Sequence, residues 1–169
     1  MNEVFAEQII KSKPSSKEIG GRIAVVVLFV ASLLGLPLLA NAHLGILGFT
    51  MIFLSGYLIY YIFKITDIEF EYSVANYDLY VEKIMGQIKR KRCKVFDLKK
   101  AVVIAPEKSE KVASYLNVEK MYDYSSRRKD AEKMVAVFNS DRGTEVVFFE
   151  PNEKIAKAIK SLRPTVYNE

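Results

Sequence analysis

The longest run of apolar positions lies near the beginning of the chain, from Ile23 to Phe63, and it contains no Asp, Glu, Lys or Arg. The run is roughly twice the ~20 residues that one helix needs to cross a bilayer. Polar side chains interrupt it at Asn41-Ala42-His43, shortly after Pro37, which would kink or end a helix. The pattern therefore predicts two transmembrane helices joined by a short turn, Ile23–Ala40 and Leu44–Phe63.

Two other interpretations of this run are a buried helical hairpin and a cleaved signal peptide. A buried helical hairpin of a soluble protein would show a polar stripe, yet Val25–Val30 has no polar residue and Ile46–Leu54 has only Thr50. A cleaved signal peptide would fit the small residues of Ala40-Asn41-Ala42. However, the segment before the first span contains acidic as well as basic residues, and a second apolar span follows at once. Both features favour two membrane spans.

Basic residues flank the outer ends of the apolar run. Arg22 precedes the first predicted helix and Lys64 follows the second, whereas the turn between them has no Lys or Arg. The positive-inside rule then places both termini in the cytoplasm, as in a multi-pass protein of the cell membrane. Ala31 and Gly35 form a small-xxx-small pair, which suits packing within the hairpin as well as a homo-oligomer.

Beyond Lys64 apolar and polar residues alternate, which is typical of strands, and the last segment changes to helical spacing. In the helix predicted over 151–162, Ile155, Ala158, Ile159 and Leu162 share one apolar face. Seven segments are predicted as strands: Ile68–Val74, Leu79–Met85, Ile88–Phe96, Ala101–Ala105, Met121–Ser125, Met134–Asn139 and Thr144–Glu150. The order predicts an α+β membrane protein whose antiparallel strands are closed by a C-terminal helix.

The chain thus divides into a cytoplasmic tail (1–22), a transmembrane hairpin (23–63) and a cytoplasmic domain (64–169). Within the tail, apolar residues of the segment 4–10 alternate irregularly with charges. This segment could form an interfacial helix on the membrane or dock on the domain, and the sequence does not choose between the two. The net charge of +5 is mild. No basic run accompanies a recognisable nucleic-acid-binding fold, so we expect no nucleic-acid partner.

The chain resembles small, functionally uncharacterised bacterial two-helix membrane proteins with a C-terminal bacterial PH-like domain. The resemblance covers nearly the full length and implies a PH-like antiparallel β-barrel of about seven strands with a closing helix, but no activity. It rests on four stretches: Val4-Phe5-Ala6-Glu7-Gln8 with Lys11-Ser12-Lys13-Pro14; Phe70-Glu71-Tyr72-Ser73; Lys89–Arg92 leading to Asp97-Leu98; and Phe148-Phe149-Glu150-Pro151-Asn152-Glu153-Lys154.

The most prominent candidate site is a basic run on the third predicted strand, which consists of Lys89, Arg90, Lys91, Arg92 and Lys94. Regular alternation along a strand would place Arg90, Arg92 and Lys94 on one face. One interpretation is a patch that binds anionic lipid headgroups, with about 1 kcal/mol for each cation near the leaflet. The other is a solvated edge strand whose charges prevent aggregation.

The remaining candidates are weaker. Ser126-Arg127-Arg128-Lys129 is a second basic cluster, expected in an exposed loop. His43 is alone and cannot form a His-rich metal site, and the lone Cys93 lies among cations that could lower its pKa. The candidate acidic residues show no spacing that suits general acid–base chemistry. They are Asp78, Glu82, Asp97 and the pair Glu150 and Glu153. We therefore expect no catalytic site, metal or cofactor.

These features favour a non-enzymatic, membrane-tethered PH-like binding or scaffold module. Its partner would be the anionic lipid of the cytoplasmic leaflet or another protein, including a membrane protein. Two further classes stay open. One is a subunit of an oligomeric pore or transporter, although the spans lack the polar lining that permeation requires. The other is an enzyme whose site the sequence does not reveal.

Overall fold

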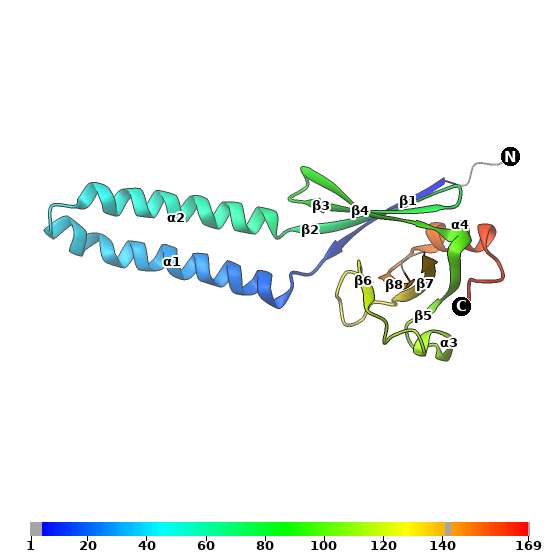
Figure 1. The fold of residues 1–169 in the computed structure, drawn as a ribbon. Helices are drawn as coiled ribbons and strands as arrows, with labels where there is room; N and C mark the ends of the chain where they lie inside the picture. Colours follow the sequence, from blue (N-terminus) through cyan, green and yellow to red (C-terminus); the bar gives the residue numbers. More distant parts are fainter. Residues whose placement is uncertain (1–4, 141–142, 169) are drawn as a thin grey trace. The chain divides into compact units, whose positions relative to one another are not determined.

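A computed structural model of the chain describes residues 5–140 and 143–168 (Figure 1). The described residues form two compact units. One unit comprises residues 14–68 and is helical, and the other combines residues 5–13 with residues 69–168. This division differs from the predicted one, because the N-terminal residues belong to the C-terminal domain.

The helical unit is an antiparallel hairpin of α1 (Ser16–Asn41) and α2 (Gly45–Ile65). α1 begins well before Ile23 because Ser15 caps it: the Ser15 side chain accepts from the Glu18 amide, and the Glu18 carboxylate accepts from the Ser15 amide. Pro37 lies inside α1 rather than ending it. The chain reverses at Ala42 and His43, where His43 adopts a positive φ of 60°.

Apolar side chains cover the outside of this hairpin. α1, which is described throughout, buries no side chain, and α2, also complete, buries Gly48 and Ser55 alone. Between the helices, the Ser32 and Ser55 hydroxyls lie 3.1 Å apart, and a Cβ at Gly48 would come within 2.6 Å of Leu36 Cδ1. A Cβ at Gly35 would have no such neighbour within 4 Å. Both helices are long and apolar enough to cross a membrane by length and composition.

The other unit is an α+β domain, and its described residues hold eight strands in two four-stranded sheets. The first sheet has the order β1-β2-β3-β4 and the second the order β5-β7-β8-β6. The strands are β1 (Phe5–Ser12), β2 (Ile68–Ala75), β3 (Asp78–Met85), β4 (Lys89–Asp97), β5 (Ala101–Pro106), β6 (Lys120–Asp123), β7 (Met134–Ser140) and β8 (Gly143–Phe149). Short helical turns η1 (Leu98–Lys100) and α3 (Glu110–Ala113) flank β5, and α4 (Glu153–Leu162) follows β8.

The predicted α+β class of the domain is confirmed, but the predicted barrel is not closed. The sheets do not join into a closed barrel, and β6 pairs with β8 in parallel, whereas β3–β4, β5–β7 and β7–β8 are antiparallel. The core between the sheets includes Tyr72, Leu79, Phe149 and the α4 residue Ile159, each completely buried. Ile155 and Ile159 are buried as predicted, and Ala158 is buried beside them, whereas Leu162, which was also predicted to be buried, is half-buried.

The eighth strand, β1, was not predicted. Of the two alternatives for this segment, residues 5–12 dock on the domain rather than forming an interfacial helix, because β1 hydrogen-bonds to β2 at the edge of the first sheet. β1 leads into α1, and β2 follows α2 (Figure 1). The helical hairpin is therefore an insertion between two neighbouring strands of one sheet, and its two ends belong to the same sheet.

Candidate binding groove beside strand β4

The basic run lies on β4, and a bulge splits it. Val81 pairs with Lys94, but the next residue, Glu82, pairs with Arg92, so Cys93 is the extra residue. Such a bulge interrupts the alternation of side chains between the two faces. Since Val81 is completely buried, its partner Lys94 points toward the core, whereas Arg92 lies opposite Glu82 on the other face.

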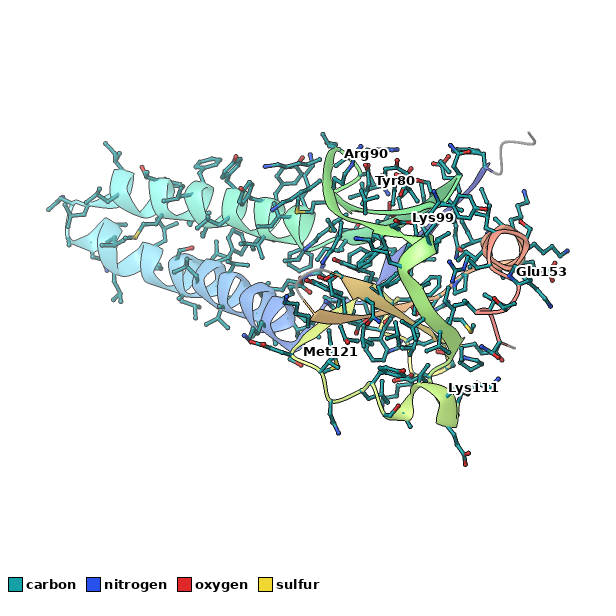
Figure 2. The ribbon with its side chains drawn as sticks, turned by 45° about the vertical axis from the view of Figure 1, so that its right-hand side comes forward. Tyr80, Arg90, Lys99, Lys111, Met121 and Glu153 are labelled. Carbon is teal, nitrogen blue, oxygen red and sulfur yellow. The ribbon has the colours of Figure 1, made fainter. Side chains whose placement is uncertain are left out.

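The outer cations are paired with carboxylates. Arg90 Nη1 lies 2.8 Å from Glu71 Oε2, and Arg92 Nε lies 3.2 Å from Glu82 Oε1. The guanidinium of Arg92 also lies 5.6 Å from the ring centre of Tyr80; Figure 2 labels Tyr80 and Arg90 on the β3–β4 hairpin. Burial raises the pKa of Glu71, and so does a hydrogen bond with Glu7, although Arg90 opposes them. The charges of Arg90 and Arg92 are thus largely compensated within the domain.

Lys94 joins the two sheets. Its Nζ lies 2.6 Å from Glu145 Oε2 on β8 and 3.1 Å from the Tyr122 hydroxyl on β6, and it sits 4.4 Å from the Tyr122 ring centre. Burial is the largest single influence on the pKa of Lys94 and lowers it. The hydrogen bonds to Glu145 and Tyr122, together with the charge interactions with these two residues, outweigh burial and raise this pKa. Lys94 is therefore a charged structural contact between β4 and the second sheet.

The prediction that Arg90, Arg92 and Lys94 share one face is therefore wrong, because of the bulge at Cys93. Lys89 and Lys91 remain exposed. Of the two interpretations of Cys93, the one with a lowered pKa is not supported, because burial raises the pKa of this thiol more than Lys83 and Lys91 lower it.

β4 differs from the edge strands of the second sheet, β5 and β6. On the other edge of the first sheet, the Gln8 side chain of β1 donates to Glu150 O at 2.8 Å and accepts from the Asn152 amide at 2.7 Å, which ties β1 to the segment before α4. The outer side of β5 is covered by residues 166–168, since the Ile104 amide donates to Val166 O. β6 is only four residues long. Within residues 5–140 and 143–168, no main-chain hydrogen bond reaches β4 from any strand but β3.

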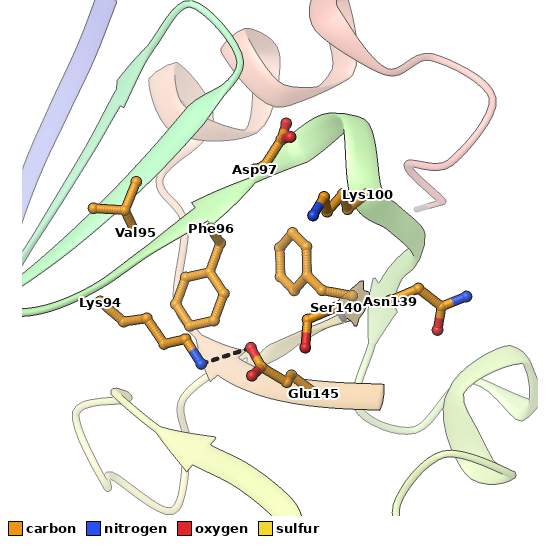
Figure 3. Close-up of a pocket in the computed structure, with 9 residues that line it drawn as sticks. Lys94, Val95, Phe96, Asp97, Lys100, Asn139, Ser140 and Glu145 are labelled. Carbon is orange, nitrogen blue, oxygen red and sulfur yellow. Dashed lines mark hydrogen bonds and ion pairs between the residues drawn. The ribbon is translucent and has the colours of Figure 1, made fainter. Parts of the chain in front are cut away.

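A groove of about 290 Å³ runs beside this free edge (Figure 3). On one side it is lined by four consecutive residues of β4, from Lys94 to Asp97. Successive side chains of a strand point to opposite faces, so four in a row can line one groove only where the groove follows the edge of the strand. The other lining residues are Lys100, Phe138, Asn139, Ser140 and Glu145.

The floor of the groove is aromatic and its rim is polar. The rings of Phe96 and Phe138 stack with their centres 5.0 Å apart. The Lys94–Glu145 ion pair crosses one end of the groove (Figure 3). Asp97 caps η1 by accepting from the Lys99 amide at 2.9 Å. The site can therefore accept an apolar side chain between polar groups.

Two main-chain positions of β4 present their hydrogen-bonding groups to this groove. The Leu98 amide donates to Tyr77 O at 2.7 Å, which makes these opposite residues a hydrogen-bonded pair. Such pairs alternate with non-bonded pairs along an antiparallel ladder. Phe96 and Lys94 are then bonded to β3, whereas the N–H and C=O of Val95 and the N–H of Asp97 point away from it. The C=O of Asp97 is used within the domain, because the C=O of an N-cap residue accepts the first hydrogen bond of its helical turn.

The sequence model of the family "Bacterial PH-like domain (DUF6106)" matches residues 2–169. The chain belongs to this family. No curated protein and no solved structure matches the chain. The family match therefore supports the fold and a binding role for the domain, and it assigns no ligand.

In this PH-like domain the second predicted cluster is a fixed loop rather than a free patch. The Ser126 amide donates to Glu150 Oε1 at 2.6 Å, and the Lys13 amide donates to Ser126 O at 2.8 Å. Arg128 lies 4.0 Å from Glu150 and donates to the Ser126 hydroxyl. These contacts connect the end of β1 to the loop before β7. The loop thus serves the packing of β1 in the PH-like domain.

A larger hollow of about 720 Å³ lies beside this loop, between residues 106–108 and 128–134. Cations and carboxylates alternate around it, including Lys108, Arg128 and Lys133 with Glu107 and Glu132. It lacks both an aromatic floor and a strand edge. The β4 groove of the PH-like domain is therefore the better-defined candidate. The sequence missed its Val95, Phe138 and Asn139, because main-chain direction and distant neighbours leave no local signal.

Proposed function

We propose that the protein is a membrane-anchored PH-like binding module without enzymatic activity. The hairpin of α1 and α2 spans the bilayer, and the domain engages its partner at the cytoplasmic face through the groove beside β4. The family supports a binding or scaffold role in general, and the groove supplies a defined surface for it.

The observation that carries this proposal is the insertion of the hairpin between β1 and β2. These strands are hydrogen-bonded neighbours, so residues 13 and 69 must lie on the same side of a membrane. The segment between them must then cross an even number of times. Two helices of sufficient length and apolar surface satisfy this requirement, and the flanking Arg22 and Lys64 favour the cytoplasm for both ends.

Accessibility of single cysteines tests the anchor. In a Cys93→Ser background, Ala42→Cys should react with a membrane-impermeant maleimide added outside intact cells. Lys99→Cys, on the exposed surface of the domain, should react only after the membrane is permeabilised. Labelling of Lys99→Cys from outside, or release of the chain from membranes by alkaline carbonate, would refute the topology.

Site-specific photo-crosslinking tests the groove in the same cells. A photoreactive amino acid at Val95, which is 38% exposed beside the groove, should give a discrete adduct. The matched control is the same amino acid at Lys157 on α4, whose side chain is 80% exposed. An adduct at Val95 that is absent at Lys157 supports the proposal. Identical adducts at both positions, or none at Val95, contradict it.

A further inference from the structure

We propose that the groove binds an extended, acidic segment of a partner protein, which adds as a strand to the free edge of β4. This inference rests on the proposed function, because it names the partner of the same groove. It follows from three properties of β4: main-chain groups that face the groove, exposed cations along the strand, and an aromatic floor beside it.

Main-chain pairing is the first property. The N–H and C=O of Val95 and the N–H of Asp97 point away from β3, and both residues line the groove. An edge strand in this state is a template for another extended chain. In the second sheet, residues 166–168 of this same chain cover the outer side of β5, and β6 is only four residues long. In the first sheet, β4 differs from the other edge strand, β1, because it lines the groove and carries the exposed cations Lys89 and Lys91.

The charge of β4 is the second property. Arg90 and Arg92 are paired with Glu71 and Glu82, but the exposed Lys89 and Lys91 add positive charge to the same strand. Opposite charges on neighbouring strands contribute roughly 0.2–1 kcal/mol per pair. An acidic partner segment would therefore be favoured over a neutral or basic one.

The third property is the stacked pair of Phe96 and Phe138, which lines the groove. Alternate side chains of an added strand point to one face, so an apolar residue at every second position could lie over these rings. The partner segment is thus expected to alternate acidic and apolar residues.

A second copy of this chain fits the edge less well. Two β4 strands paired across a twofold axis centred on the basic run would bring cations opposite cations, which is destabilising. An anionic bilayer could neutralise Lys89 and Lys91, but it offers no main-chain groups to Val95 and Asp97. The experiment below separates all three occupants.

The test uses the full chain in nanodiscs of zwitterionic lipid that hold one copy each. The probe is a nine-residue peptide of alternating glutamate and valine, matched to the length of β4. Two control peptides are the same length: one replaces glutamate with lysine, and the other is methylated at every main-chain nitrogen. We expect the acidic peptide to bind at least ten-fold more tightly than either control. Deuterium exchange of the segment from Lys94 to Asp97 should slow when it binds.

A pair of variants at Val95 tests the direction of the main-chain groups. Val95→Pro removes an N–H that β3 does not use, and proline is tolerated at such edge positions. It should weaken peptide binding at least ten-fold relative to Val95→Thr, which changes the same side chain but keeps the N–H. If Val95→Pro fails to fold, the methylated peptide decides the same question on the unchanged protein.

Four outcomes would overturn the inference. Equal binding of the acidic and methylated peptides would show that charge alone attracts the segment. Slowed exchange at Lys94 to Asp97 in nanodiscs containing phosphatidylglycerol, without peptide, would assign the edge to lipid. Slowed exchange that appears only with two copies per nanodisc would assign it to a second chain. If no peptide binds while Val95 still crosslinks in cells, strand addition is wrong but the proposed binding module stands.

Discussion

Apolar side chains face outward along the helical hairpin and inward in the PH-like domain. Leu34 of α1 and Phe53 of α2 are 74% and 77% exposed, while Leu79 and Ile159 of the domain are completely buried. Polar side chains show the reverse arrangement, since Ser55 is buried between the helices and the domain surface is charged. The comparison supports the proposal that the hairpin lies in a bilayer, since its apolar side chains face outward, while those of the domain are shielded from water.

The strongest test of this comparison separates the two units. The fragment 66–169 lacks β1, so the first sheet loses an edge strand and the contacts of Gln8 and Ser12. We expect it to show no cooperative thermal unfolding by circular dichroism. Joining residues 1–13 to 69–169 through Asn-Gly, which favours a two-residue hairpin turn, should give a soluble domain that unfolds cooperatively. Equal behaviour of the two proteins would contradict the insertion.

The second largest difference is expected when one large apolar side chain is truncated in each unit, because only the domain buries such side chains. Ile159→Ala leaves a cavity in a packed core and should lower the free energy of unfolding by about 2–5 kcal/mol. Leu34→Ala, on an outward face, should change it by less than about 0.5 kcal/mol. Urea titration of the full chain in detergent micelles would measure both. Similar losses would show that α1 is packed against protein rather than lipid.

Removing the ion pair between the sheets should lower the free energy of unfolding by a smaller amount. Lys94→Met leaves Glu145, whose side chain is 7% exposed, without its cation and should cost roughly 1–3 kcal/mol. Arg92→Gln removes a pair whose cation is 64% exposed and should cost less than about 1 kcal/mol. Thermal unfolding of the joined domain would give both values. The assignment of Lys94 to the inner face fails if Arg92→Gln is the more damaging change.

The smallest expected effect lies inside the hairpin. Ser55→Ala removes the hydroxyl that lies 3.1 Å from Ser32, and interhelical hydrogen bonds of this kind average about 0.6 kcal/mol in membranes. Thr50→Ala is the control, because Thr50 bonds only to the carbonyl of Ile46 in its own helix. Helix-hairpin stability in mixed micelles should fall for Ser55→Ala and stay within about 0.5 kcal/mol for Thr50→Ala.

The hairpin and most strands could be predicted because their patterns are local. The absence of charge from Ile23 to Phe63 is visible without any partner, and so is the spacing of Ile155 and Ile159. β1 could not be predicted in this way. Its outward residues Phe5 and Ile9 are apolar and exposed, whereas its buried residues Ala6 and Ser12 are small. The usual relation between hydrophobicity and burial is thus reversed along this strand.

The candidate groove was out of reach for a different reason. The sequence indicated β4 as a candidate because of its basic run. The bulge at Cys93, however, depends on the register with β3, and it turns the Lys94 side chain to the face opposite the expected one. The lining residues Asp97 and Ser140 are distant in sequence and meet only in the folded domain. Groups of the main chain, such as the Val95 N–H, are present at every position and so carry no signal in the sequence.

The insertion of the hairpin between β1 and β2 also sets an order of events during synthesis. β1 leaves the ribosome first, but its neighbour β2 follows only after both helices, a delay of several seconds at about 5–20 residues per second. During that time the nascent strand has no partner in its sheet. If the hairpin spans the bilayer as proposed, β1 and β2 can pair only when both emerge on one side. An error in inserting the hairpin would then also prevent the PH-like domain from folding.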